Sequence, residues 1–86
     1  MEKSLFSRNY KLFLRLLVDL RKEAGITQEQ LAKRLGETQS FVSKCERGER
    51  RIDIVELAAF CRALRISLPT FAAKFSTELD KELSRK

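Results

Sequence analysis

The sequence predicts an all-α protein, a compact five-helix bundle that forms a single domain over residues 1–86. Three observations support this prediction. Apolar residues recur at helical spacing in five successive segments, most of these segments have their own start or stop signals, and none alternates as a half-buried strand would. A chain of this length has room for one domain with a small core, which we expect over residues 9–80.

The first two helices are predicted from their apolar spacing and their ends. The first runs from about Asn9 to Ala24, and Gly25 supplies a left-handed stop. The second begins after Thr27, which forms a capping box with Gln30, and it ends at Gly36. The apolar positions of the first helix are Phe13, Leu16, Leu17 and Leu20.

The third and fourth helices follow the same pattern. Thr38 caps a short helix that Gly48 closes. Asp53 and Glu56 then form a second capping box, which begins the fourth helix. The apolar residues of that helix are Leu57, Phe60, Cys61 and Leu64.

The fifth helix opens at Ser67 and Pro69, because proline is tolerated in the first turn, where its missing N–H would have no partner. We expect the charged segment from Lys81 onward to fray. The apolar stripe of this helix is Phe71, Phe75, Leu79 and Leu83.

The composition narrows the function. Eighteen basic residues against twelve acidic ones give a net charge of +6, which favours a polyanionic partner such as nucleic acid. The chain has no histidine, and its two cysteines are too far apart in sequence for a CxxC motif, so we expect no metal, no cofactor and no enzyme activity. No apolar run is long enough for a membrane span or resembles a signal peptide, so we expect a cytoplasmic protein without a membrane partner.

The second and third helices, over residues 27–46, carry the strongest functional signal. The short link between them, Gly36-Glu37-Thr38, predicts a steep crossing with one face of the third helix exposed. No acidic residue occurs from Thr38 through Cys45, although a solvated helix would usually include some. Amide, hydroxyl and ammonium groups suit base edges in a DNA major groove. The exposed residues expected on this face are Gln39, Ser40, Ser43, Lys44 and Arg47.

The segments Thr27–Gly36 and Gln39–Gly48 resemble the helix-turn-helix of lambdoid phage repressors and Cro, within the class called the xenobiotic-response-element family. The resemblance covers roughly Phe13 to Phe71. Its combined pattern is Thr-Gln, Leu-Ala, Gly, Gln, Val-Ser and Glu-x-Gly, which is specific only when taken together. It implies a bacterial or phage-encoded transcription regulator, most simply a repressor.

The resemblance implies a role for each matching position. Gln28, at the start of the second helix, would bind a DNA phosphate, as the anion preference of a helix N-terminus also favours. Gln39, Ser40 and Lys44 match the principal base-contacting positions, and Ser43 is a possible fourth. The phosphate contacts would be completed by Arg47, Arg50 and Arg51.

Each of these roles has a plainer alternative. Gln28 can be a favourable first-turn residue, Gln39 and Ser40 can be solvated polar residues, and Lys44 can contact a phosphate. Arg50 and Arg51 can belong to a solvated loop. Phe41 either packs against the second helix, which we favour, or contacts a thymine methyl group.

The resemblance also implies a partly buried ion pair between Arg21 and Glu46, which would hold the third helix against the first. We interpret Cys45 and Cys61 as small core residues, with a redox switch as the less favoured alternative.

One recognition helix contacts few base pairs, so we expect a homodimer that binds two half-sites of a double-stranded operator. The candidate interface residues are Phe75, Leu79 and Leu83 on the fifth helix, and Leu5, Phe6 and Tyr10 form a second candidate. We expect no small-molecule ligand. The alternative function is a protein-interaction module, such as an antitoxin or adaptor with the same fold, which would not need an acid-free exposed face on the third helix.

Overall fold

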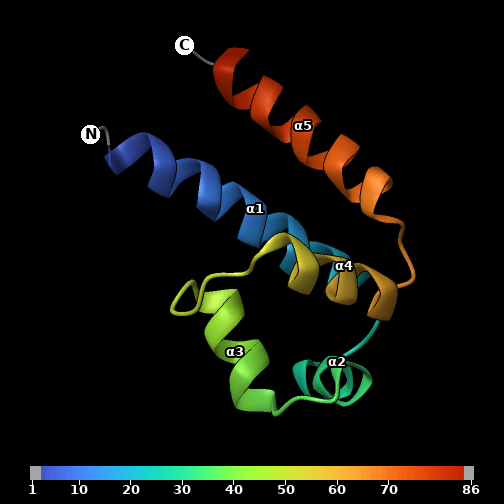
Figure 1. The fold of residues 1–86 in the computed structure, drawn as a ribbon. Helices are drawn as coiled ribbons and strands as arrows, with labels where there is room; N and C mark the ends of the chain where they lie inside the picture. The colour runs from blue at the N-terminus through green and yellow to red at the C-terminus, as the bar shows by residue number, and fades with distance from the viewer. Residues whose placement is uncertain (1–2, 85–86) are drawn as a thin grey trace.

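The computed structural model describes residues 3–84, with side chains described from Arg8 onward. Within this range the regular structure consists of five α-helices (Figure 1), which confirms the predicted all-α fold class. In chain order the helices are α1 (Lys3–Glu23), α2 (Gln28–Leu35), α3 (Gln39–Arg47), α4 (Ile54–Ala63) and α5 (Leu68–Ser84).

Two predicted boundaries were wrong. Helix α1 begins at Lys3 rather than near Asn9, because no glycine or proline lies in this stretch and each added residue extends an existing helix at little cost. Helix α5 continues to Ser84 instead of fraying from Lys81. An ion pair between Lys81 Nζ and Glu78 Oε2, at 3.6 Å and i,i+3 spacing, supports its last turns.

The predicted N-caps of α2, α3 and α4 are present as hydrogen bonds. Thr27 Oγ1 accepts from the backbone N–H of Gln30 at 3.1 Å, and Gln30 Oε1 accepts from that of Thr27 at 2.8 Å. Asp53 and Glu56 make the same reciprocal pair at 2.8 and 2.9 Å. Thr38 caps α3 through the N–H of Phe41. Each cap of this kind stabilises its helix by about 1 kcal/mol.

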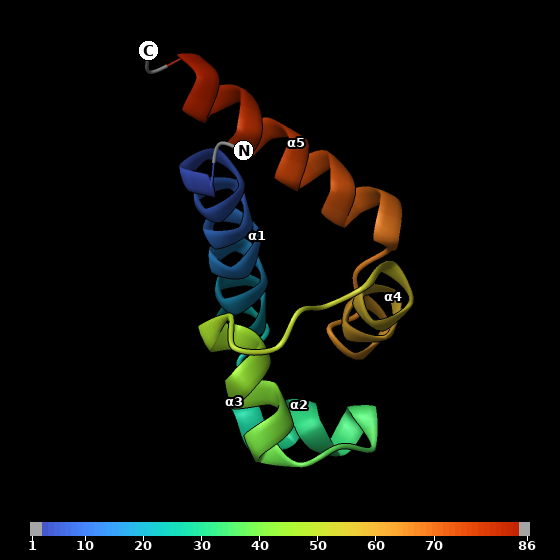
Figure 2. The same cartoon turned by 60° about the vertical axis from the view of Figure 1, so that its left-hand side comes forward.

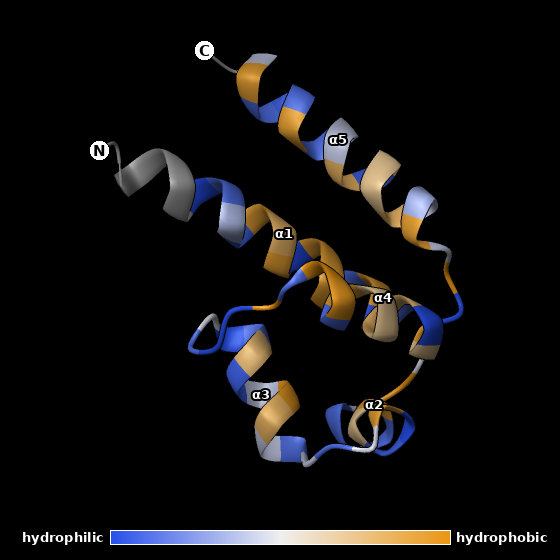
Figure 3. Cartoon of the chain, in the orientation of Figure 1, coloured by the Kyte–Doolittle hydropathy of each residue, from blue (hydrophilic) through white to orange (hydrophobic). Residues whose placement is uncertain are grey.

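The core takes at least one almost fully buried side chain from every helix. These are Leu17, Leu31, Val42, Phe60 and Phe71, none of them more than 1% exposed. Burying such a side chain contributes about 1.5–3 kcal/mol. Figure 3 shows the resulting concentration of apolar residues in the middle of α1 and along α4.

The helices are arranged so that α2 and α3 occupy one end of the molecule. The first turns of α1 and the last turns of α5 lie at the other end (Figures 1 and 2). Helices α1 and α5 lie along each other, joined by edge-to-face contacts of Phe13 with Phe71 and Phe75. None of the described helices is long and apolar enough to span a bilayer.

Candidate nucleic-acid interface

Helix α3 exposes the face that its sequence predicts. Its apolar residues Val42 and Cys45 are 0% exposed, so the opposite side of this two-turn helix faces outward. Gln39, Ser40 and Lys44 are exposed there, and Ser43 is half-buried. In the described part of the chain, Ser40 and Lys44 make no side-chain hydrogen bond or ion pair, so their polar groups remain available to a ligand.

A continuous chain of side-chain hydrogen bonds joins α2 to both ends of α3. Gln39 Nε2 donates to Gln28 Oε1 at 2.6 Å, and Gln28 Nε2 donates to Glu46 Oε1 at 2.8 Å. The first residues of the two helices are thereby coupled, and both are coupled to the glutamate near the end of α3. We call Gln39, Gln28, Glu46 and its partner Arg21 the glutamine relay.

The relay has a direction, because an ionised carboxylate only accepts hydrogen bonds. Glu46 therefore requires the amide nitrogen of Gln28 to point towards it, which turns the Gln28 oxygen towards Gln39. That oxygen in turn requires the amide nitrogen of Gln39. The carboxylate thus determines which edge of Gln39 remains free, namely its oxygen and its second N–H.

The relay is anchored on α1 by a buried ion pair. Arg21 Nε lies 2.6 Å from Glu46 Oε2, and a second guanidinium nitrogen donates to Glu46 Oε1 at 3.1 Å. The third nitrogen donates to the carbonyl of Ile26 at 2.9 Å. The two hydrogen bonds to Glu46 make the pair bidentate. The two side chains are only 10% and 5% exposed, so the pair is largely withdrawn from water. It holds α3 against α1, as the family resemblance implies.

The arginine that ends α3 is held within its own segment. Arg47 donates two hydrogen bonds to the Glu49 carboxylate, at 3.0 and 3.1 Å, and a further one to Ser43 Oγ. The hydrogen bonds from Arg47 hold the pKa of Glu49 below its ordinary value. Both side chains are more than half exposed, so this ion pair contributes little to stability.

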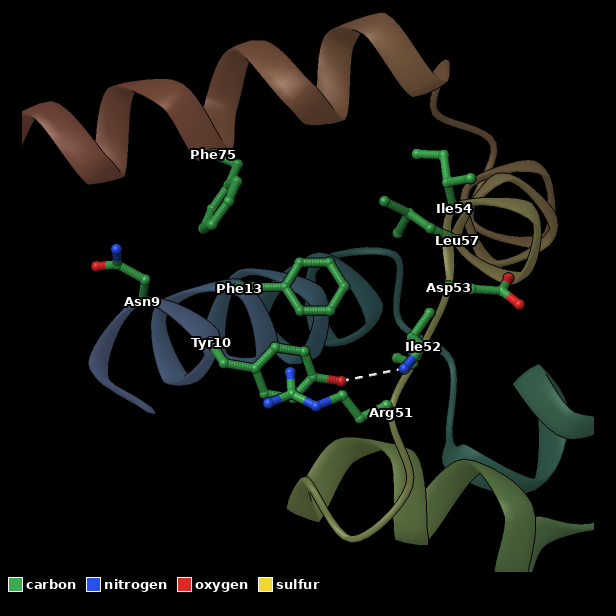
Figure 4. Close-up of a pocket in the computed structure, with 9 residues that line it drawn as sticks. All are labelled: Asn9, Tyr10, Phe13, Arg51, Ile52, Asp53, Ile54, Leu57 and Phe75. Atoms are coloured by element: carbon green, nitrogen blue, oxygen red, sulfur yellow. Dashed lines mark hydrogen bonds between the residues drawn. The ribbon is translucent and has the colours of Figure 1, made fainter. Parts of the chain in front are cut away.

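The two loop arginines each lie on an aromatic ring. The Arg50 guanidinium carbon is 4.8 Å from the ring centroid of Phe41, and a nitrogen of Arg50 is 2.8 Å from Glu56 Oε2. The hydrogen bond from Arg50 lowers the pKa of Glu56. Arg51 covers the ring of Tyr10 at 4.4 Å, as Figure 4 shows. Cation–π contacts therefore hold the Arg50 guanidinium against α3 and the Arg51 guanidinium against α1.

Phe41 is half-buried and its ring centroid lies 6.4 Å from that of Phe60, so it packs inward against α4, whereas the sequence favoured packing against the second helix. Cys45 and Cys61 are free thiols, 0% and 1% exposed. Burial raises the pKa of both thiols, which keeps them protonated and favours their role as packing residues.

The apolar surface is larger than the sequence suggested. Phe75 lies at the edge of the core and Leu79 is half-buried, whereas Leu83 is 65% exposed. Ile54 and Val55, which were not among the interface residues predicted from the sequence, are 63% and 75% exposed in the first turn of α4. The sequence did carry a signal for this exposed surface, namely two adjacent β-branched apolar residues directly after an N-cap. The side chains of Leu5 and Phe6 lie outside the described part.

The exposed turn of α4 borders an apolar depression of about 330 Å³ between α1, α4 and α5. Phe13 and Phe75 form its sides in Figure 4, and Tyr10 lies below them with its hydroxyl oxygen accepting from the Ile52 N–H at 3.1 Å. Ile54 lines the same depression. The face formed by α5 and the start of α4 is therefore the main apolar face on the described surface.

Two short helices that cross at a glycine turn, with the second one exposed and polar on its outer side, define a helix-turn-helix module. A family model described as helix-turn-helix matches residues 17–71. The chain belongs to this helix-turn-helix family, of the xenobiotic-response-element (XRE) type.

The chain is similar to several known proteins, of which three are described. An uncharacterised HTH-type transcriptional regulator, y4dJ of Sinorhizobium fredii, is 36% identical over 63 residues, a match that covers 67% of this chain and 82% of that protein. An XRE-family-like protein from Pseudomonas syringae pv. tomato superposes with a TM-score of 0.82 and 42% identity, covering 88% of this chain and 93% of its own. The wild-type restriction-modification controller protein C.Esp1396I superposes with a TM-score of 0.78 and 26% identity, covering 85% and 95%.

Proposed function

We propose that this protein regulates transcription by binding a double-stranded DNA operator, with α3 lying in the major groove. The observation that carries the proposal is the acid-free outer face of α3, on which Gln39, Ser40 and Lys44 are exposed and Ser43 is half-buried. Family membership and the similarity to proteins named as regulators and as a restriction-modification controller support DNA-binding transcription regulation. Occupancy of a promoter would make the protein a repressor, acting in the bacterial cytoplasm.

The free edge of Gln39 suits adenine. Gln28 takes up one N–H of the Gln39 amide, which leaves its oxygen acceptor and its second N–H donor for a ligand. Adenine presents the complementary pair in the major groove, the N6 amino donor and the N7 acceptor. Lys44, five residues further along α3, supplies a cation that suits guanine O6 and N7.

Gln28 remains able to bind a phosphate while it belongs to the relay. Its amide nitrogen donates one hydrogen to Glu46, so the second is free at the N-terminus of α2. The unpaired backbone N–H groups of that first turn add a favourable field for an anion. Arg47, Arg50 and Arg51 are proposed to contact the same strand, with Arg50 and Arg51 held in place by their ring contacts.

Replacing Arg50 by glutamine is expected to weaken binding to specific and random duplexes alike. The slope of log K against log salt should fall by about one, because one phosphate contact is lost. The slope is measured by fluorescence anisotropy at four or more salt concentrations. Lys74→Gln on α5 is the matched control and should leave the slope unchanged. An equal slope for Arg50→Gln and wild type would show that Arg50 does not contact a DNA phosphate.

We further propose a two-fold homodimer formed chiefly through α5. A single copy leaves Leu83 on α5 and Ile54 and Val55 on α4 open to water, and Phe75 and Ile54 line the apolar depression between these helices. Covering such a face is the usual basis of a dimer, and two copies would contact two half-sites about 34 Å apart.

Sedimentation equilibrium at micromolar concentration tests the dimer. The wild type is expected to sediment as a dimer and Leu83→Glu as a weaker one. Thr77→Glu, on another side of α5, adds the same charge and should change nothing. A monomeric wild type both alone and with duplex DNA would contradict the dimer.

Selection of bound sequences from a random duplex library tests the proposed function itself. The expected result is a two-fold symmetric consensus containing adenine, with much weaker binding to random duplex. A protein-interaction module would yield no consensus and little retention on heparin, and either result would contradict sequence-specific regulation.

A further inference from the structure

Three arginines gather on a face of the molecule that the proposed DNA contact does not use. Arg34 comes from the end of α2, Arg62 from the end of α4, and Arg65 from the turn after the C-cap of α4. They surround an open depression of about 510 Å³. Its remaining lining is apolar and consists of Leu35, Ala59 and Ala63. We call this site the arginine basin.

The positive charge of the arginine basin is not neutralised locally. Arg34 donates to the carbonyl of Ala63 at 2.7 Å, which satisfies a carbonyl at the end of α4 and holds the guanidinium at the rim. In the described part of the chain, Arg62 and Arg65 make no hydrogen bond or ion pair with their side chains. No acidic residue lines the depression, so three cations surround an apolar floor.

Arg65 occupies a backbone position that glycine would fill more easily. Its φ is 62°, whereas the equivalent left-handed stops after α1, α2 and α3 are glycines at 75°, 71° and 83°. The backbone hydrogen bonds from Ile66 to Cys61 and from Arg65 to Arg62 close α4 in the usual way and do not need a side chain. A left-handed backbone is strained for arginine and not for glycine, so the fold itself gives no reason for an arginine at this position.

The arginine basin is separate from the glutamine relay. Arg34 lies six residues beyond Gln28, which corresponds to about 9 Å along α2 and about 120° around it. Arg62 and Arg65 lie at the end of α4 opposite to the loop of Arg50 and Arg51. A duplex bound along α3 would therefore leave the arginine basin open.

We infer that the arginine basin binds an acidic, leucine-containing segment of a partner protein. Guanidinium groups bind carboxylates through paired hydrogen bonds, and arginine is enriched at protein interfaces. The apolar floor favours a peptide over a DNA backbone, because a sugar-phosphate chain has no aliphatic side chain to place against Leu35 and the two alanines. This inference does not depend on the proposed DNA contact.

The test uses a fluorescein-labelled dodecapeptide that repeats Glu-Asp-Leu, with binding followed by anisotropy at low salt. Arg65→Gly is expected to weaken binding about 3–5-fold, the usual effect of one exposed ion pair, while the Tm of the protein stays equal or rises. Arg62→Gln combined with Arg65→Gly should weaken it about tenfold or more. Lys74→Gln removes one positive charge elsewhere and should have no such effect.

Two comparisons identify what the arginine basin selects. A peptide in which glycine replaces leucine should bind less well, and a random 20-base-pair duplex should bind Arg65→Gly and wild type equally. Equal peptide affinity for Arg65→Gly, Lys74→Gln and wild type would overturn the proposal. A loss of duplex affinity in Arg65→Gly that matched the loss for the peptide would assign these arginines to DNA instead.

Discussion

Replacing Arg21 by alanine is expected to lower the free energy of unfolding by about 3–5 kcal/mol, because it leaves the Glu46 carboxylate buried without its partner. A chain of this size has a total stability of only about 4–13 kcal/mol. The variant should therefore lose roughly a quarter of its stability or more. Urea unfolding followed by circular dichroism measures the change, and a constant m-value would show that the unfolding transition is otherwise the same.

Arg15→Ala is the matched control, since Arg15 lies on the same helix and is exposed. It should change the stability by no more than about 0.5 kcal/mol. The double variant Arg21→Met, Glu46→Met should lose less than Arg21→Ala, because it buries no unpaired charge. If Arg21→Ala cost no more than Arg15→Ala, the pair would be too well hydrated to anchor α3.

The second large effect is expected at Gln39. Gln39→Ala should weaken binding to a selected operator by about 1–3 kcal/mol, which is roughly 5–150-fold, and should hardly affect random duplex. The physical reason is that the paired donor and acceptor of the Gln39 amide contact a base edge, whereas random duplex is bound through phosphates. Anisotropy titrations with the two duplexes at one salt concentration measure the difference.

Ser76→Ala, at an exposed position of α5, controls for the removal of a polar surface group and should alter neither affinity. Equal losses on selected and random duplexes would mean that Gln39 contacts the backbone and not a base. Glu46→Gln provides a further comparison, because a neutral amide no longer determines how the relay amides are turned. It should reduce discrimination between adenine and other bases at the same position.

The helix ends were predictable because local chemistry determines them. The capping boxes at Thr27 and Asp53 and the stops at Gly36 and Gly48 depend on residues within a few positions of one another. The start of α1 was not predictable in this way, because no cap marks it and a helix extends as far as its sequence allows. The same reasoning explains why α5 passes its expected end at Lys81.

The outward face of α3 was predictable from the sequence, but the hydrogen bonds between its side chains and those of other helices were not. The pattern of α3 indicated an outward face, and Gln39 and Gln28 were both singled out. The bond between them, and its continuation to Glu46, depends on the crossing of α2 over α3, which brings residues 11 and 18 positions apart into contact. Composition and spacing do not determine such long-range geometry. The stacking of Arg51 on Tyr10 joins residues even farther apart.

The most direct test of the DNA contact is an amide NMR titration of the ¹⁵N-labelled protein with its selected duplex. The largest shifts are expected at the starts of α2 and α3, around Gln28, Gln39 and Ser40, and in the loop that holds Arg50. The amide resonances of α5 that lie outside its apolar face should shift little. Shifts confined to α4 and α5, with those at the start of α3 unchanged, would contradict the account.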